Sequence, residues 1–570
     1  MQASDLARRR SPAYLAGSVA MALALGAAAG CPRDSQLVDN GKVLVFHQQQ
    51  EPDALNALIS DMVATSDALR PIQEGLVTVT DRLEVVPVLA MEIPTVENGG
   101  VVVQGDRMVV TWQLREGVTW HDGQPFTADD VKFTWEVIMH PKTRVTSRDG
   151  FDKIDRIEIL GPHRIRLHFK QIYAPHDLLF SGGGAILPRH VLERYLQDPN
   201  GDSINQAPFN RAPIGTGPFK FKEWVSGDHI AMVANERYWR GRPKLDALRM
   251  RIVPDENAAF TLLKSGELDL YQSASINQYE ALRKLAHVRL EPTASLTWEH
   301  LDFNLGRPVF QDLRVRRAIA HAINKRQISE KIYQGLYAVA HSDLAPLSWA
   351  YNKGVEERYP FDPARARALL DEAGWRPGLD GIRVKDGKRF VIKISTTAGR
   401  KTRELTELVL KYYLKKVGIE LLIDNHPGPI LFGGHPSGIL KGFKFDLGMS
   451  AWSAGPDPDN FALWHSSQIP PAGQNHVQFR NKEMDALLEQ GTRSIRRADR
   501  ARIYARTAEI LADELPMIPL LYWSQLDPVS KRLRHFKPNP SSAGNLWNVH
   551  EWEVVPLQQA LAEPAVEKKE

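Results

Sequence analysis

The chain has one cysteine among its 570 residues, Cys31, and this count restricts the fold more than any other feature. A single cysteine cannot form a disulfide within the chain, so the fold has to rest on a large hydrophobic core. Thiolate metal sites and a cysteine nucleophile are excluded from everything that follows Cys31. Apolar residues make up 43% of the sequence and charged residues 25%, which is the composition of a globular protein that can supply such a core.

The segment before Cys31 has the pattern of an export signal. Three arginines at 8–10 precede an apolar run, rich in Ala and Leu, that covers residues 13–29. An alternative is a membrane anchor, because the run nearly reaches the ~20 residues of a membrane span. The small residues directly before the cysteine instead resemble a bacterial lipoprotein signal, with Ala28 where Leu is usual. That resemblance implies that residues 1–30 are removed and that a lipid on Cys31 holds the protein at the membrane.

The charge balance gives no argument for a nucleic-acid ligand. The 72 basic and 68 acidic side chains leave a net charge of +4, and Asp5 with the three leader arginines accounts for +2 of it. The remaining +2 is too small for so long a chain to attract a phosphate backbone. No second apolar run of membrane length follows the leader. We therefore expect the exported part to be soluble apart from its anchor, and monomeric.

The rest of the sequence alternates short β-like runs with helical stretches, which is an α/β pattern. In the first half, strands are predicted at 42–46, 108–114 and 164–169. A turn at His121-Asp122-Gly123 and a capping box that begins at Thr127 predict a helix between the second and third of these strands.

The second half is more helical, from about residue 310 to 515. Asp312 and Asp362 are placed to cap helices with apolar stripes, and Gly374 ends the second of them. Strands are predicted between and after the helices, at 390–394, 420–423 and 514–523. The paired glycines at 215 and 217 predict a tight turn.

Seven segments are informative because they occur together and in one order. They are 112–131, 215–219, 235–239, 263–269, 303–319, 362–375 and 452–459. In this order they resemble the signature of the bacterial extracellular solute-binding proteins of family 5, the large binding proteins of peptide and nickel transporters. The first segment, 112–131, is the most specific, and the resemblance extends over about 42–556.

The resemblance implies an α/β, periplasmic-binding-protein-like two-lobe fold (class II, cluster C type). An additional subdomain is expected in the first lobe, and a ligand cleft between the lobes. The expected parts of the chain are a signal peptide at 1–30, a tether at 31–41, lobe I from 42–85, 205–300 and 525–556, the additional subdomain at 86–204, lobe II at 301–524, and a flexible tail at 557–570.

The resemblance also implies where a ligand binds. In this family an extended peptide lies between short strands of the two lobes, so that its main chain gains hydrogen bonds whatever its sequence. One strand matches the Trp-x-x-Asp region of relatives, and the other follows the Pro-Asp-x-Leu-Asn segment at 52–56. Trp452 is either a wall of the pocket or an ordinary core residue. The expected ligand-binding residues are Met62, Val63, Ala64, Trp452, Ser453, Ala454, Gly455 and Asp457.

One departure from the family pattern concerns the substrate. Relatives that hold a peptide's free α-amino group use an Asp three residues after the Trp, and Gly455 stands at that position. The missing carboxylate removes a charge-assisted hydrogen bond worth roughly 1.5–3 kcal/mol. Asp457 or Asp459 can replace it, although an Asp beside Pro is at least as often a turn former. We therefore expect longer oligopeptides whose N-terminus is loosely held.

The sequence lacks the G-x-S-x-G, H-E-x-x-H and Walker A motifs. We therefore expect no enzymatic activity, no cofactor and no metal site, and keep a secreted hydrolase only as a third alternative. The resemblance implies the substrate-binding component of an ABC importer, with an oligopeptide as ligand and a permease and its ATPase subunits as partners. The expected location is the periplasm or the outer face of the cytoplasmic membrane. A non-peptide ligand stays open, because relatives on this scaffold bind oligosaccharides, haem, opines or chelated nickel.

Overall fold

The computed structural model describes residues 42–562 except 183–185, 199–202 and 291. The predicted signal peptide (1–30), the predicted lipidation site Cys31 and the tether (31–41) therefore lie outside the described residues. Within the described part of the chain, no helix combines the length and the apolar character that crossing a membrane requires.

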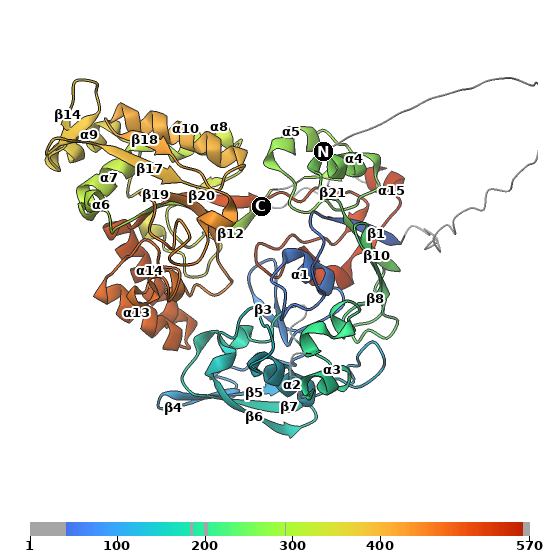
Figure 1. Ribbon diagram of the computed structural model, residues 1–570. Coiled ribbons are helices and arrows are strands. Elements are labelled where there is room, and N and C mark those ends of the chain that lie inside the picture. Colours follow the sequence, from blue (N-terminus) through green and yellow to red (C-terminus); the bar gives the residue numbers. More distant parts are fainter. Residues whose placement is uncertain (1–41, 183–185, 199–202, 291, 563–570) are drawn as a thin grey trace, which may run out of the picture. The chain divides into compact units, whose positions relative to one another are not determined.

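The strand predicted at 42–46 is part of a sheet whose strands come from distant parts of the sequence (Figure 1). Leu44 and Phe46 are fully buried on one face, as alternation along a strand requires. Trp552, near the end of the chain, packs in the same core. The strand order is β1 (Val43–Gln48), β10 (Ala247–Ile252), β9 (His229–Ala234) and β8 (Phe219–Val225), with only the β1–β10 pair parallel.

A second four-stranded sheet contains the strands predicted at 108–114 and 164–169, each confirmed within one residue. The helix predicted between these two strands is α2 (Ala128–Met139). The capping box is present, since the Thr127 N–H donates to Asp130 and the Thr127 hydroxyl accepts from the Asp129 N–H. The strand order is β4 (Val101–Gln104), β5 (Arg107–Gln113), β7 (Arg164–Phe169) and β6 (Ile154–Gly161).

The largest sheet has six strands and combines parallel with antiparallel pairs. The long strand β12 is antiparallel to both of its neighbours, and β17 is parallel to both of its own. The order is β13 (Ala338–Val339), β20 (Met517–Gln525), β12 (Thr293–Phe303), β19 (Leu447–Ser453), β17 (Val391–Ser395) and β18 (Glu420–Ile423). Its core is shared with α7 (Leu313–Ala322), α9 (Pro363–Glu372) and α10 (Lys401–Lys416), drawn in yellow-green to orange in Figure 1.

The helices predicted at Asp312 and Asp362 are confirmed. The side chain of each residue accepts a hydrogen bond from a backbone N–H of the first turn. The second helix, α9, ends before Gly374, which has a φ of 86° that glycine adopts without strain.

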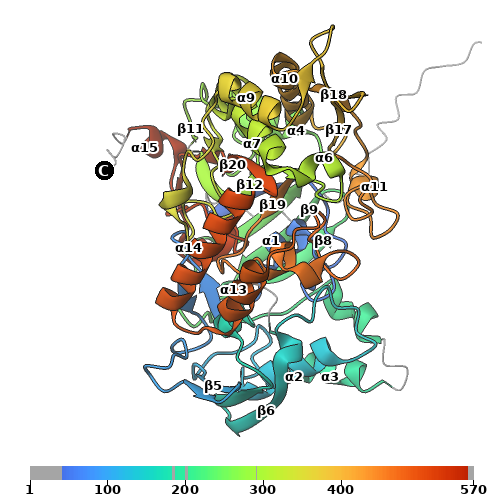
Figure 2. The same cartoon turned by 90° about the vertical axis from the view of Figure 1, so that its left-hand side faces the viewer.

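The strand predicted at 514–523 begins later than expected. Residue 514 is the last residue of α14 (Arg497–Glu514), and the strand starts at Met517. Helix α14 lies beside α13 (Lys482–Arg493), as Figure 2 shows. The helix continues because a buried arginine satisfies its terminal carbonyl groups. The guanidinium of Arg316 donates to the carbonyls of Glu514 and Leu515 at 2.5 to 3.2 Å.

The glycine pair at 215 and 217 serves close packing of two chain segments, and the hydrogen-bonded tight turn predicted there is a bend instead. A Cβ on Gly215 would lie 1.8 Å from the carbonyl oxygen of Ile72, and one on Gly217 would lie 2.6 Å from the carbonyl oxygen of Pro71. The Gly217 N–H donates to the Ile72 carbonyl at 2.9 Å. Both positions therefore exclude any side chain.

The tail predicted to be flexible, 557–570, begins with a helix. Residues Leu557–Ala562 form α15 directly after Pro556, whose carbonyl accepts the N–H of Ala560. The flexibility of the tail stays a prediction. The boundaries of the predicted lobes stay a prediction.

Candidate ligand-binding site

The stretch 451–457 contains five of the eight predicted ligand residues and forms the end of β19 with the turn after it. β19 pairs with the central strand β12, and Trp298 is the partner of Trp452. The pairing ends at Ser453, and the Ala454 N–H still donates to the Leu296 carbonyl at 3.3 Å. The exposed members are Ser453 and Gly455, and the partly buried ones are Trp452, Ala454 and Asp457.

Three side chains of β12 lie on the face of the sheet that carries Trp452. Trp298, His300 and Asp302 share that face because they occupy alternate positions of one strand. The centroids of the Trp298 and His300 rings are 4.1 Å apart. Ser450 of β19 stands opposite His300, and its Oγ lies 3.3 Å from Nε2 of that ring. A row of aromatic and polar groups therefore leads along the sheet to Trp452.

Asp302 is a buried carboxylate between two histidines. Its Oδ2 lies 2.8 Å from Nε2 of His476 and 3.3 Å from Nε2 of His300. Burial by itself raises the pKa of a carboxyl group, but the attraction of the two histidines outweighs it and holds the pKa of Asp302 well below its usual value. The group is therefore a carboxylate at neutral pH and orients both rings.

A small cavity of about 70 Å³ adjoins Trp452 on this face. Within the described residues, Trp298 Nε1 and His300 Nδ1 are buried without a hydrogen-bond partner. A buried polar group without a partner costs about 1–3 kcal/mol, so a hydrogen-bonding group that entered here would be stabilised. The walls include Trp298, His300, Asp302, Trp452, Trp464 and His476.

A larger cavity of about 630 Å³ includes Pro456 and Asp457 of the same turn. Its volume is in the range of about 300–1,000 Å³ that is usual for small-molecule sites. The other walls come from segments far apart in the sequence, namely 83–85, 93–97, 174, 176–178, Trp349, 495–498 and Arg500. The turn after β19 therefore stands between two cavities, one beside Trp452 and one beside Asp457.

The carboxylate of Asp457 is already paired within the protein. Its two oxygens accept from the guanidinium of Arg500 at 2.5 and 2.6 Å. Although burial lowers the pKa of a guanidinium, the hydrogen bonds and charge of Asp457 raise that of Arg500 above its usual value. The Asp457 carboxylate also accepts the N–H of Asp459 at 3.0 Å, so the alternative that this residue forms a turn is confirmed.

The other predicted ligand residues, Met62, Val63 and Ala64, begin a helix and do not form the expected short strand. Met62 precedes α1 (Val63–Leu69), and the Ser60 hydroxyl accepts the Met62 N–H while it bonds to the Thr65 hydroxyl. These local hydrogen bonds favour the start of a helix over a strand. Neither of the two cavities includes these three residues. Val63 is 70% exposed, whereas Ala64 is buried.

Sequence reasoning missed most of the residues that surround the turn. Trp298, His300 and Asp302 gave no clear signal, because the alternate positions of β12 also carry polar side chains, such as Thr297 and Glu299. Arg500 and Trp349 gave no local signal, because each meets the turn only through the tertiary fold. Among the described residues, no group of three or more His, Cys, Asp or Glu side chains is arranged to hold a metal ion.

Comparison with known proteins agrees with this architecture. Residues 84–470 match the family of bacterial extracellular solute-binding proteins, family 5 (middle). The oligopeptide-binding protein AppA of Bacillus subtilis is 29% identical over 96% of this chain and 99% of its own length. The structure of AppA in complex with a nonapeptide superposes with a TM-score of 0.71 over 90% of this chain and 99% of that chain. NikZ from Campylobacter jejuni, solved in complex with Ni(L-His), is 26% identical, with a TM-score of 0.73 and the same coverage.

The chain therefore belongs to the bacterial extracellular solute-binding proteins of family 5. Its solved neighbours have the two-lobe fold of this family, so the predicted fold class is confirmed. The members of the family are extracellular transport proteins that bind solutes.

Proposed function

We propose that this chain is the substrate-binding component of an ABC importer, and that it captures oligopeptides and delivers them to a membrane permease with ATPase subunits. The observation that carries the proposal is the turn at the end of β19, which lines a cavity of about 630 Å³. The alignment with AppA, an oligopeptide-binding protein, over 96% of this chain supports a peptide as the ligand.

The end of β19 suits the recognition of a peptide main chain. Ser453 and Gly455 are exposed, so an extended segment can lie beside them and form main-chain hydrogen bonds that do not depend on its sequence. Trp452 supplies an aromatic surface next to these groups, and aromatic side chains contribute strongly to binding. For the opposite wall we retain Met62, Val63 and Ala64. The 70% exposure of Val63 supports this role, since a ligand there would cover an apolar side chain.

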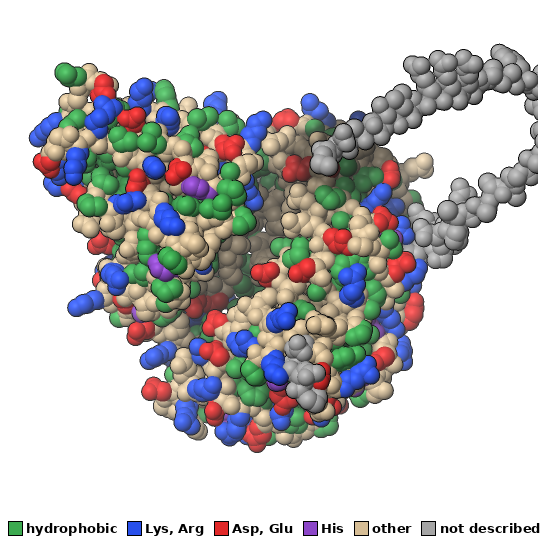
Figure 3. Space-filling model, viewed as in Figure 1, with side chains coloured by type: hydrophobic (Ala, Val, Ile, Leu, Met, Phe, Trp, Pro, Cys, Tyr) green, Lys and Arg blue, Asp and Glu red, His purple; other side chains and the backbone are tan. Residues whose placement is uncertain are grey.

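The charges at the turn favour a ligand whose N-terminus is not fixed. Gly455 supplies no carboxylate, that of Asp457 is paired with Arg500, and that of Asp459 accepts the N–H of Phe461. Positive and negative side chains are interspersed over the face shown in Figure 3, so no single sign dominates there. We infer that peptides of mixed sequence and length bind through their main chain and apolar groups.

The proposed mechanism is binding without chemistry. A ligand that contacts both lobes stabilises a closed arrangement by its differential affinity for the closed and open states, and the closed form is what a permease would recognise. No bond is broken, so the proposed mechanism needs no cofactor. One copy of the chain has both lobes, so we propose that it acts as a monomer. A lipid on Cys31 would keep it at the membrane surface near the permease.

The test is native mass spectrometry of the exported protein as purified, followed by titration calorimetry with the ligand that is found. Peptides of mixed sequence are expected, and Trp452→Ala should weaken their binding by roughly tenfold or more. Trp135→Ala is a matched control, because Trp135 is also partly buried but lies on α2 outside both cavities.

A co-purified sugar, haem or metal chelate would overturn the peptide assignment while leaving the transport role. The nickel complex of NikZ makes a chelate a definite outcome to look for. Binding that Trp452→Ala and Trp135→Ala reduce equally would show that Trp452 acts on stability and does not contact the ligand.

A further inference from the structure

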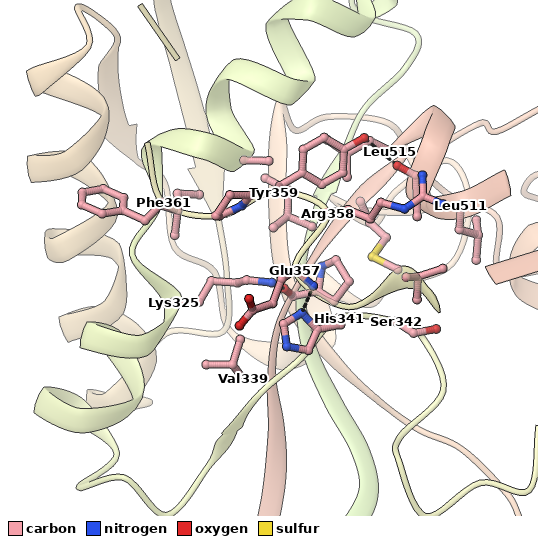
Figure 4. Close-up of a pocket in the computed structure, with 18 of the residues that line it drawn as sticks. Lys325, Val339, His341, Ser342, Glu357, Arg358, Tyr359, Phe361, Leu511 and Leu515 are labelled. Carbon is pink, nitrogen blue, oxygen red and sulfur yellow. Dashed lines mark hydrogen bonds between the residues drawn. The ribbon is translucent and has the colours of Figure 1, made fainter. Parts of the chain in front are cut away.

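A separate cavity of about 400 Å³ lies beside the six-stranded sheet and contains none of the predicted ligand residues. Its walls come from the end of α7, the start of α8 (Lys325–Ile332), the loop 355–361, α14 and β20. Figure 4 shows Lys325 and Phe361 on one side of it, with Leu511 and Leu515 on the other. The two sides of the cavity therefore come from segments that lie next to the six-stranded sheet, of which β20 is one strand.

The loop that closes this cavity is held in place by specific contacts. Glu357 has a φ of 52°, a left-handed conformation that is costly for a residue with a side chain. Its N–H donates to Nδ1 of His341 at 3.1 Å, drawn as the dashed line in Figure 4. The hydroxyl of Tyr359 donates to the carbonyl of Ala512 in α14 at 2.6 Å. The cavity is therefore built by the fold and does not result from a loosely placed loop.

The wall carries one ammonium group, that of Lys325, which has no ion pair among the described residues. Lys325 Nζ donates to the carbonyls of Ala340 and Pro519 at 2.6 and 3.1 Å. An ammonium has three hydrogens to donate, so one remains. Among the described residues, no carboxylate oxygen lies within the 4.0 Å of an ion pair with Lys325. Removal from water lowers its pKa to about 8, and the charge of Glu357, farther away in the same wall, opposes part of this shift. The group is therefore mainly charged at neutral pH.

The other charged residues of the wall pair with one another or with neighbours. Arg358 lies 2.5 Å from the carboxylate of Asp513, and Arg326 lies 3.9 Å from that of Glu357. Glu357 also attracts Lys325, so the three positive charges of Lys325, Arg326 and Arg358 face the two negative charges of Glu357 and Asp513, and a net charge of +1 is left. Most of the remaining wall is apolar, namely Ala320, Ile323, Val339, Val355, Pro360, Phe361, Ala508, Leu511, Ala512, Leu515, Met517, Ile518 and Pro519.

We propose that this cavity is a second binding site, for a small amphipathic monocarboxylate whose carboxylate pairs with Lys325 and whose apolar body packs on the α14 and β20 side of the wall. One positive charge beside an apolar surface matches a monoanion with a hydrocarbon body. The volume of about 400 Å³ is within the usual range for small-molecule sites. A polyanion would find a net charge of only +1, and a neutral hydrocarbon would leave the third hydrogen of the ammonium without an acceptor.

The test is titration calorimetry of the full exported protein with decanoate and, in parallel, with 1-decanol, which has the same chain and no charge. We expect saturable binding of decanoate that is at least about tenfold tighter than that of decanol. Lys325→Met should remove this preference. Lys331→Met is the matched control, because Lys331 is exposed on the same helix and does not line the cavity. A parallel titration with N-acetylleucine tells whether a compact amino-acid derivative or a linear chain fits better.

Equal binding of decanoate to the wild-type protein and to Lys325→Met would overturn the proposal, as would the absence of saturable binding. Melting curves of both variants separate a loss of binding from a loss of folding. Trp452→Ala should leave decanoate binding unchanged, so the outcome is independent of the function proposed for the turn after β19.

Discussion

Replacing Gly455 by Asp would place a carboxylate where peptide-binding relatives hold the ligand's α-amino group. The fold accepts the change, because a Cβ at this position meets only the backbone of Asp457 at 3.9 and 4.0 Å, and φ is not in the left-handed region. A charge-assisted hydrogen bond to an ammonium contributes about 1.5–3 kcal/mol to the free energy of binding when both groups are shielded from water. Gly455 is exposed, so solvent screening reduces this to about 0.5–1 kcal/mol, or roughly two- to fivefold in affinity. Repulsion by Asp457 is small because Arg500 neutralises it.

The assay is titration calorimetry with one peptide in two forms, with a free α-amino group and N-acetylated. We expect Gly455→Asp to improve binding of the free peptide by that factor and to leave the acetylated peptide unchanged or weaker. Gly434→Asp is the control, since a side chain there also meets open space and adds the same charge. If both forms of the peptide change alike, or if the control has the same effect, the α-amino group does not lie beside residue 455 and our placement of the ligand is wrong.

Three further predictions concern stability and location. Arg500→Met leaves the Asp457 carboxylate without its partner, and we expect the free energy of unfolding in urea to fall by about 2–4 kcal/mol; an unchanged midpoint would show that the pair is solvated. The pKa of Asp302 is lower in the folded than in the unfolded chain, so its contribution to stability is present above pH ~4 and is lost as the pH falls below that value. Asp302→Asn should therefore be less stable than wild type at pH 7, with a smaller difference at pH 3, measured by urea unfolding at both. Cys31→Ser should move the exported protein from the membrane fraction to the soluble one, and an unchanged distribution would contradict lipidation.

Local chemistry made the elements predictable wherever it acted alone. The capping box at Thr127 and the caps at Asp312 and Asp362 each depend on a side chain and the next few N–H groups, and all three helices begin as predicted. The strands β5 and β7 followed from apolar alternation. These signals are complete within one stretch of sequence, so no knowledge of the rest of the fold was needed.

Predictions failed where a distant partner decided the outcome. The start of β20 was placed too early because the C-terminus of α14 is satisfied by Arg316, about 200 residues away in the sequence. Gly215 was assigned to a turn, but what it needs is the space beside Ile72. In both cases the deciding contact joins segments whose pairing cannot be read from either one.

The candidate site could be predicted only in part, for the same reason. The family pattern alone predicted a strand at Trp452, and β19 contains Trp452 and Ser453, whereas Ala454 and Gly455 follow it. The partner of Asp457 was not, since Arg500 comes from a helix that reaches the turn only in the folded chain. The row Trp298, His300 and Asp302 was not predictable, because β12 has polar residues on both faces and only its pairing with β19 shows which face carries Trp452.

Gly455 and Asp457, two residues of the turn after β19, have the same effect on the charge that a ligand meets there. Gly455 withholds a carboxylate from the ligand, and Arg500 withholds that of Asp457 by pairing with it. A peptide end carries a full charge, and a site reads it only when an uncompensated opposite charge is fixed nearby. The other carboxylate of the turn, Asp459, has no ion pair but already accepts the N–H of Phe461 at 2.9 Å. Most of the free energy of binding therefore has to come from main-chain hydrogen bonds and from apolar contact with Trp452. Such contacts repeat along any extended peptide, so they tolerate different lengths and sequences. Broad specificity is thus what the electrostatics of this turn require if it binds peptides.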